Sequence, residues 1–277
     1  MVLLLSTYEL GRQPFGLASP AAWLRAAGLA VHVHDLSIER LPPAALDGVS
    51  LVAVHLPMHT ATRLALPLIA AIAGRAPGAV ICAYGLYAPL NAERLREAGV
   101  SVVLGPEAEG ELVTVAKAVV AGQALPDVPL DSLPRLAFRI PDRAGLPALE
   151  RYARLEWPDG RCSVVGATEA TRGCKHRCRH CPIVPVYDGQ FRVVPSEVVL
   201  ADVRAQVEQG AEHITFGDPD FFNGPTHARR LIEALHREWP TLTYDATIKV
   251  EHLRAHDALL PVLRDTGCAF VTSAVES

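Results

Sequence analysis

The feature that most constrains the fold is an alternation of short apolar runs with amphipathic, helix-length segments, which occurs twice in the 277 residues. In the first half, strands are expected at Val2–Leu5, Ala30–His34, Leu51–Leu56, Ala79–Ala83 and Val100–Leu104. Helices are expected from about Ser19 and at Thr60–Ala73, Pro89–Glu97 and Glu107–Ala121. Uniformly apolar strands between amphipathic helices predict a parallel α/β sheet that is covered on both faces.

This pattern predicts a flavodoxin-like, doubly wound domain at residues 1–125, with its ligand at the carboxyl ends of the strands. No GxGxxG or Walker sequence follows any of these strands, so a nucleotide is not favoured as that ligand. Residues 126–160 are rich in proline and show little periodicity. They are interpreted as a packed linker.

The alternation resumes in residues 161–277, which predicts a second α/β domain. Strands are expected at Ser163–Ala167, His213–Phe216, Thr243–Ile248 and Ala269–Ser273. Helices are expected at Ser196–Gln209 and Pro225–Glu238, and over His252–Asp265 with a break near Asp257.

Three cysteines, Cys174, Cys178 and Cys181, follow the first of these later strands with a CxxxCxxC spacing. Three thiolates this close can surround one cluster of irons, but they cannot all pair as disulfides. An iron–sulfur cluster normally takes four protein ligands, so three would leave one iron open. An open metal position is typical of catalytic rather than structural sites. Neighbouring basic residues such as Arg172 offset the charge of the thiolates.

Two other interpretations of the cysteines remain open. A zinc ion could use the three cysteines with His176, His180 or Cys162, although the second distant cysteine pair of zinc ribbons is missing. A disulfide is less favoured, because nothing in the sequence indicates an oxidising compartment. The other cysteines, Cys82, Cys162 and Cys268, are predicted to be small buried hydrophobic residues.

Charge and hydropathy narrow the class of protein. The net charge of -4 does not favour a dedicated nucleic-acid binder. The amino-terminal VLLLS is too short for a signal sequence, and the apolar stretch at residues 61–73 contains Arg63 and Pro67. That stretch has the length of a buried helix rather than of a membrane span. A cytoplasmic enzyme without nucleic-acid or membrane partners is therefore expected.

The cysteine run, in its context ATEATRGCKHRCRHCPI, resembles that of the radical S-adenosylmethionine (SAM) enzymes. The resemblance implies that Cys174, Cys178 and Cys181 hold a [4Fe-4S] cluster whose fourth iron is chelated by SAM. It implies reductive cleavage of SAM to a 5'-deoxyadenosyl radical, with electrons from an external one-electron reductant such as flavodoxin or ferredoxin. It also implies a small-molecule substrate and a partial (β/α)6 barrel. Only four barrel strands can be counted before Ser277, so an incomplete barrel, as in a fragment, is expected.

Segments after the later strands also resemble this family. The turn Gly217-Asp218-Pro219-Asp220 is similar to a sequence near the SAM amino group, although it is also an ordinary turn signal. By resemblance, the candidate SAM-binding residues are Gly217, Asp218, Asp220, Lys249, Ser273 and Glu276. Lys249 would pair with the SAM carboxylate, and Glu276 would accept hydrogen bonds from the ribose.

The first domain resembles the cobalamin-binding domain that precedes the barrel in many radical SAM enzymes. The similarity lies in LSTYELGRQPFGLASPAAWLRAAG, Gly85-Leu86-Tyr87 and Gly105-Pro106-Glu107. By resemblance, the candidate cobalamin residues are Thr7, Tyr8, His55, Leu56, Gly85, Leu86, Tyr87, Gly105 and Glu107. The DxHxxG sequence is absent, so a lower histidine ligand is not expected. Glycines at strand ends are, however, also what any doubly wound fold requires.

The resulting functional expectation is a transferase that uses cobalamin to methylate an unactivated carbon or a heteroatom. The amino-terminal stretch and GDPDFFNGP are also similar to a subgroup with a cysteine- or selenocysteine-containing carboxyl-terminal tail. Transfer of an aminocarboxypropyl group without cobalamin is the alternative for such enzymes. A zinc-stabilised, non-catalytic binding module and a simple cobalamin carrier are alternatives from other classes.

Overall fold

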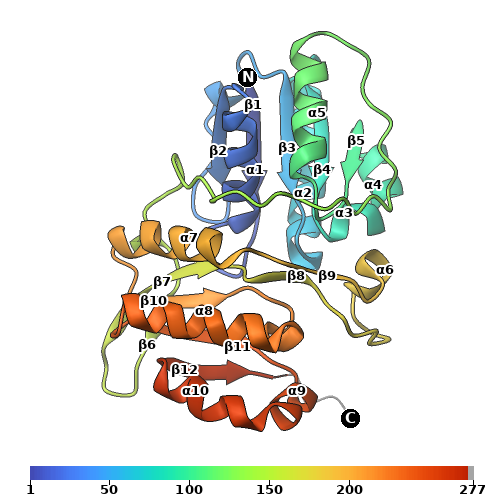
Figure 1. Ribbon diagram of the computed structural model, residues 1–277. Coiled ribbons are helices and arrows are strands. Elements are labelled where there is room, and N and C mark those ends of the chain that lie inside the picture. Colours follow the sequence, from blue (N-terminus) through green and yellow to red (C-terminus); the bar gives the residue numbers. More distant parts are fainter. Residues whose placement is uncertain (274–277) are drawn as a thin grey trace. The chain divides into compact units, whose positions relative to one another are not determined.

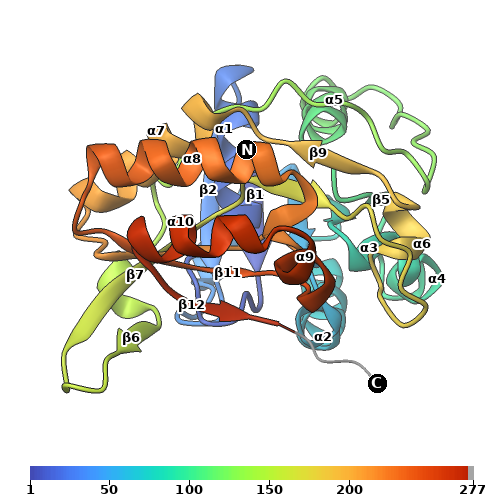
Figure 2. The ribbon, with the colours of Figure 1, turned by 60° about the horizontal axis from the view of Figure 1, so that its bottom comes forward.

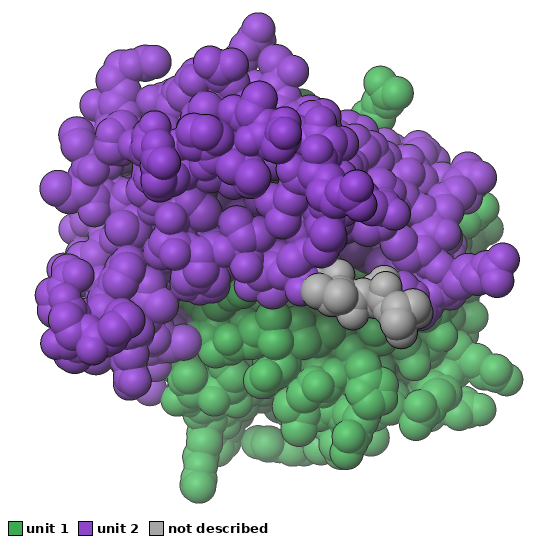
Figure 3. Space-filling model, turned by 90° about the horizontal axis from the view of Figure 1, so that it is seen from below, with its two compact units in different colours: residues 1–147 green, residues 148–277 purple. Residues whose placement is uncertain are grey.

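The computed structural model describes residues 1–273. It contains two mainly parallel five-stranded sheets, one in each half of the chain (Figure 1). The chain divides into two compact units, Met1–Pro147 and Ala148–Ser277, which are coloured separately in Figure 3.

The sheet of the first unit has five parallel strands in the order β2-β1-β3-β4-β5. The strands are β1 (Val2–Ser6), β2 (Val31–Asp35), β3 (Leu51–His55), β4 (Val80–Tyr84) and β5 (Val102–Leu104). In its register, Val2 of β1 lies beside Val31 and Leu51. This strand order is the one that flavodoxin-like doubly wound sheets have.

Helices cover both faces of this sheet. They are α1 (Phe15–Ala26), α2 (His59–Arg75), α3 (Tyr87–Leu90), α4 (Ala92–Glu97) and α5 (Glu109–Val120), with a 3-10 turn, η1, at Pro43–Leu46. Val2 and Leu4 of β1 pack into one core with α1 and α5, whereas Leu3 and Leu5 pack into a second core with α2 and α4. Burial on both faces explains why the strands are uniformly apolar.

The single helix expected at Pro89–Glu97 is wrong, because the structure has two short helices separated at Asn91. The Asn91 backbone leaves the helical region at φ -123° and ψ 18°. Its side-chain amide donates a hydrogen bond to the Tyr87 carbonyl (2.8 Å). Asparagine side chains compete with helical backbone hydrogen bonds in this way.

The proline-rich stretch is divided between the two units. Val128, Leu130 and Leu146 pack against the cores of the first unit. Arg143 there donates a hydrogen bond to Gln13 Oε1 (2.8 Å). From Ala148 onward the stretch belongs to the second unit.

The sheet of the second unit has the order β12-β11-β10-β7-β6, and its last four strands along the chain are parallel. Its strands are β6 (Arg154–Glu156), β7 (Cys162–Thr168), β10 (His213–Phe216), β11 (Thr243–Thr247) and β12 (Cys268–Thr272). Its helices are η2 (Leu149–Arg151), α6 (Val184–Tyr187), α7 (Ser196–Glu208), η3 (Phe221–Asn223), α8 (Pro225–Glu238), α9 (Val250–Ala255), η4 (Asp257–Leu259) and α10 (Leu260–Asp265). The break expected near Asp257 is confirmed by the boundary between α9 and η4.

Helices α7, α8 and α10 lie along one face of this sheet (Figure 2). Helix α8 buries Ala228, Leu231, Ile232 and Leu235. This spacing of three and four residues forms one apolar stripe along the helix, so a single face packs inward.

The prediction that three cysteines are buried is correct for Cys82 but wrong for Cys162. Cys162 is exposed because it begins β7 opposite Glu156 of the edge strand β6, an antiparallel pair that the sequence pattern did not predict. Cys268 is half-buried. Among residues 1–273, no helix combines the length and the apolar character that crossing a membrane requires.

Candidate metal centre

The three cysteines lie on one loop, residues 174–181, which is called the cysteine loop below. It begins after β8 (Thr171–Gly173), and β8 pairs antiparallel with β9 (Phe191–Val193). The Cys174 N–H donates to the Gln190 carbonyl (3.1 Å), which closes the base of the loop. Because β8 follows β7 closely, the loop lies beyond the carboxyl end of a parallel strand, where α/β folds bind ligands.

Gly173 allows the loop to start where it does. Its φ of +72° lies in the left-handed region. A Cβ at this position would lie 2.4 Å from Cδ1 of Tyr187 and 2.6 Å from the Gln190 carbonyl oxygen. The conformation and the space therefore both require glycine.

The environments of the thiols differ. Cys174 is buried, whereas Cys178 and Cys181 are half-buried. Burial raises the pKa of the Cys174 thiol, and the backbone N–H of His176, which donates to its sulfur, acts in the opposite direction. A bound metal cation would overcome the effect of burial, since a coordinating thiol is deprotonated.

Asn223, which the sequence analysis did not single out, tethers the start of the loop. Its Oδ1 accepts from Cys174 Sγ (3.5 Å) and from the Lys175 N–H (3.2 Å). Its side-chain amide donates to the Gly173 carbonyl (3.2 Å). The residue lies in η3, after the GDPD turn, and is 3 % exposed. An asparagine after such a turn carries no distinctive sequence signal.

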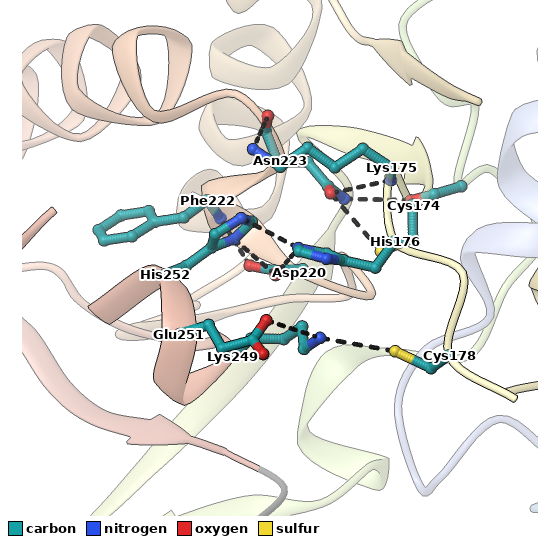
Figure 4. A network of polar contacts seen from close by, with 11 residues as sticks. Cys174, Lys175, His176, Cys178, Asp220, Phe222, Asn223, Lys249, Glu251 and His252 are labelled. Atoms are coloured by element: carbon teal, nitrogen blue, oxygen red, sulfur yellow. Dashed lines mark hydrogen bonds and ion pairs between the residues drawn. The ribbon is translucent and has the colours of Figure 1, made fainter. Parts of the chain in front are cut away.

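Lys249 follows β11 and contacts the loop, as Figure 4 shows. Its Nζ lies 3.5 Å from Cys178 Sγ and 3.3 Å from Glu251 Oε2. Burial by itself lowers the pKa of Lys249, but the contacts with Glu251 and Cys178 outweigh it and the pKa is raised. A positive charge is therefore held beside one of the thiols.

The two carboxylates of the GDPD turn are both buried, and each accepts a hydrogen bond from the chain, but Asp220 Oδ2 has no hydrogen-bond partner among the described residues. Asp218 accepts from the Ala170 N–H (2.9 Å) and from the Thr171 hydroxyl (2.6 Å). Burial raises the pKa of Asp218 to about 6 against these hydrogen bonds. Asp220 Oδ1 accepts from the Phe222 N–H (3.0 Å) and caps η3. A role for either carboxylate at the SAM amino group stays a prediction.

The other candidate SAM residues lie near strand ends. Gly217 is exposed, and its N–H donates to the Thr168 carbonyl (2.7 Å). The Ser273 hydroxyl is buried and has no hydrogen-bond partner among the described residues. Glu276 lies outside the described residues.

His176, His252 and Asp220 lie close together, and Asp220 Oδ2 is within 3.8 Å of His176 Nε2 (Figure 4). His252 Nδ1 lies 2.7 Å from Asp220 Oδ2, and His252 Nε2 lies 3.0 Å from His176 Nε2. Burial, followed by the charges of Lys249 and His252, lowers the pKa of His176. The His176 ring is therefore neutral at neutral pH.

The geometry weakens the case for a zinc site. His176, one candidate fourth ligand, turns its Nε2 toward His252. Cys162 begins β7, while the cysteine loop follows the other end of that strand. Seven residues of extended strand span about 20 Å, too far for one ion. His180 is exposed on the loop itself.

In the first unit, several candidate cobalamin residues are needed by the fold. Leu56 and Glu107 are fully buried, and the Thr7 hydroxyl donates to the Ala61 carbonyl (2.9 Å). Gly85 has a φ of +111°, and a Cβ there would lie 2.9 Å from the Leu56 carbonyl oxygen. A Cβ on Gly105 would lie 2.9 Å from the Ser132 carbonyl oxygen. These glycines fit the alternative that the fold itself requires them.

Tyr8, His55, Leu86 and Tyr87 are half-buried at the same strand ends. His55 packs against Tyr84, with ring centroids 5.1 Å apart, and its Nδ1 lies 3.4 Å from Glu9 Oε2. A Cβ on Gly16 would lie 1.9 Å from the His55 ring, so this glycine makes room for the imidazole. Neither Glu9 nor Gly16 was singled out from the sequence.

No family model and no curated protein matches the sequence. Among solved structures, the chain is similar to the radical S-adenosylmethionine methyltransferase TsrM from Kitasatospora setae with cobalamin and a [4Fe-4S] cluster bound. The TM-score is 0.72 at 18% identity, over 99% of this chain and 58% of that chain. The chain shares the fold of TsrM.

A second TsrM structure, with tryptophan substrate and the SAM analogue aza-SAM bound, gives a TM-score of 0.71 at 17% identity. It likewise covers 99% of this chain and 58% of that chain. The present chain thus spans a little over half the length of the TsrM chains that it matches.

Proposed function

We propose that this chain forms part of a radical SAM enzyme in which Cys174, Cys178 and Cys181 hold a [4Fe-4S] cluster. The observation that carries the proposal is the placement of all three thiols on one loop after a parallel strand, with Lys249 against Cys178. The fold shared with TsrM supports it.

The side chains around the loop suit a cluster of this kind. Three thiolates bring negative charge, and the ammonium of Lys249 points at the sulfur of Cys178. Donors of this kind stabilise an anionic cluster. When bound, such a cluster supplies one electron for the cleavage of SAM.

We assign the SAM site to the carboxyl ends of β10, β11 and β12. Gly217 is exposed, Lys249 has a half-buried ammonium, and Ser273 has an unpaired hydroxyl among the described residues. Lys249 is the residue suited to a SAM carboxylate, because ammonium and carboxylate attract each other. Asp218 and Asp220 would support the backbone of the turn between β10 and η3.

For the reaction, we favour cobalamin-dependent methyl transfer to a small molecule. The first unit has a doubly wound sheet whose strand ends present Tyr8, His55, Leu86 and Tyr87 as partly exposed candidates for corrin contact. The likeness to TsrM, which holds cobalamin, supports this choice. Aminocarboxypropyl transfer without cobalamin is the alternative, and the reaction product distinguishes the two.

The first prediction tests the cluster. After anaerobic reconstitution the protein should be brown and carry about four irons. Cys178→Ala should lose most of this iron, while Cys162→Ala, the matched control with an exposed thiol outside the loop, should retain it. The amount of cluster in each variant is measured by its iron content and its visible absorption.

Addition of SAM should change the EPR signal of the reduced cluster, and Lys249→Ala should weaken this change. One tightly bound zinc with negligible iron would instead support the zinc-stabilised module and contradict the proposal.

A further inference from the structure

Three side chains that can bind metal ions meet at the cysteine loop, and they come from three separate parts of the second unit (Figure 4). Asp220 precedes η3, His252 lies in α9, and His176 lies in the loop itself. One ligand atom of each residue lies within 4.8 Å of the ligand atoms of the other two. The fold therefore gathers two imidazoles and one carboxylate around one point.

Two of the gathered ligand atoms are buried without a hydrogen bond. The Asp220 side chain is fully buried, and that of His252 is 7% exposed. Asp220 Oδ1 accepts from the Phe222 N–H, but Asp220 Oδ2 and His252 Nδ1 have no hydrogen-bond partner among the described residues. These two atoms lie only 2.7 Å apart. Burying polar atoms without a partner is costly, and a cation bound by both atoms would remove that cost.

The distances between the ligand atoms suit one small ion. Two atoms that bind a tetrahedral zinc ion at its usual bond lengths lie about 3.4 Å apart. Asp220 Oδ2 lies 2.7 Å from His252 Nδ1 and 3.8 Å from His176 Nε2, on either side of that value. His176 Nε2 also lies 3.0 Å from His252 Nε2, and binding would exchange this contact for the ion. The His176 side chain is 22% exposed, so its ring is the one with room to turn.

We propose that His176, Asp220 and His252 bind one divalent transition-metal ion such as Zn²⁺, at a site separate from the iron–sulfur cluster. Two imidazoles and one carboxylate are the ligands of known zinc and iron(II) sites. The ion would join the cysteine loop to the GDPD turn and to α9, because each ligand comes from a different element. The inference goes beyond the proposed function and needs no cluster, since none of the loop cysteines is a ligand of this ion.

Positive charge near the site opposes a cation and has to be weighed. Lys249 and Lys175 both act electrostatically on His176. Lys249 Nζ, however, lies 3.3 Å from Glu251 Oε2 and 3.5 Å from Cys178 Sγ. The carboxylate, and the thiolate when the cluster is bound, offset the charge of this ammonium. Lys249 is therefore not an uncompensated charge beside the proposed ion.

The first test measures zinc binding by the full chain after anaerobic reconstitution of the cluster. Elemental analysis after removal of free zinc should find one zinc ion per chain in addition to the iron. His252→Gln and Asp220→Asn should each retain the iron and weaken zinc binding at least about 100-fold, because losing even a residue that supports a ligand costs about 10–100-fold. His180→Gln, at an exposed histidine of the same loop, is the matched control and should bind zinc as the wild type does.

The second test removes the loop thiols with the triple variant Cys174→Ala, Cys178→Ala and Cys181→Ala, whose folding is checked by circular dichroism. We expect this variant to bind one Co²⁺ per chain, with an absorption spectrum that lacks sulfur-to-cobalt charge transfer.

The outcomes separate this inference from the proposed function. A folded triple variant that binds no cobalt would overturn the inference, and so would equal zinc binding by wild type and His252→Gln. Zinc that is lost in His180→Gln would also overturn it, because that ion would belong to a cysteine–histidine site on the loop. A wild-type protein that takes up no iron, while the triple variant binds cobalt, would overturn the proposed function and leave the ion site standing.

Discussion

Asp218 and Asp220 stand two residues apart, yet their carboxylates have different partners. Asp218 accepts from the Ala170 N–H and from the hydroxyl of Thr171, the first residue of β8. Asp220 accepts from the Phe222 N–H with Oδ1, and its Oδ2 lies 2.7 Å from His252 Nδ1. Asp218 thus ties the GDPD turn to the start of the cysteine-loop hairpin, while Asp220 ties it to α9. The sequence marks both as turn residues and says nothing of these partners.

Burial of Asp218 predicts a specific dependence of stability on pH. Its pKa is raised from 3.8 to about 6 in the folded chain, so between these pH values the folded state binds more protons than the unfolded state. The free energy of unfolding should therefore fall as pH rises from about 4 to about 6, by roughly 3 kcal/mol at most. Urea denaturation at several pH values should show this fall in wild type and not in Asp218→Asn. Parallel pH profiles for the two proteins would refute the assignment.

At the scale of elements, the long helices and the parallel strands could be predicted from the sequence, but the short antiparallel strands could not. All strands of the two five-stranded sheets except β6, and helices such as α8, follow from the pattern of apolar residues. The three-residue strands β6, β8 and β9 exist only because a partner strand lies beside them, so no local pattern identifies them. The same limit applies to the candidate site: the cysteines could be found from their spacing, but His176 and His252 are 76 residues apart.

The cysteine loop gives a prediction about two glycines. Gly173 and Gly160 both have positive φ, but only Gly173 would place a Cβ against neighbouring atoms, while nothing lies within 4 Å at Gly160. Gly173→Ala should therefore lose most of the reconstituted iron and lower the free energy of unfolding by more than the ~1 kcal/mol that a strained alanine costs. Gly160→Ala should show only the backbone strain and retain iron. Equal effects of the two substitutions would show that steric contact at Gly173 does not matter.

For the whole molecule, the chain separates into two units that each bury their own core, with a boundary at Pro147. The first unit could be predicted in outline from its five apolar strands. Its carboxyl boundary could not, because proline-rich composition suggests a linker, whereas Val128, Leu130 and Leu146 pack on the unit's cores. Only tertiary contacts reveal that residues 126–147 belong to the first unit.

Cobalamin binding is the prediction at this scale. The full chain should bind hydroxocobalamin, with a visible spectrum that lacks histidine ligation, since no DxHxxG sequence is present. Leu86→Glu should weaken binding at least tenfold, because a charge at a half-buried strand end opposes an apolar corrin face. Leu90→Glu, at the exposed end of α3, is the matched control. A folded protein that retains no cobalamin at tens of micromolar would leave the cobalamin-independent reaction as the better choice. Gly85 is unsuitable for this test, because its backbone conformation serves the fold.

Because Cys162 is exposed at the start of β7, a spin label attached there would lie at a known position relative to the cysteine loop. A nitroxide attached to this thiol would sit at one end of a strand about 20 Å long, and the cysteine loop follows the other end. Paramagnetic relaxation of the label by a reduced cluster would then report where the unpaired electron resides. A label on Cys162 therefore allows the reduced cluster to be detected by EPR without a change to any residue of the cysteine loop.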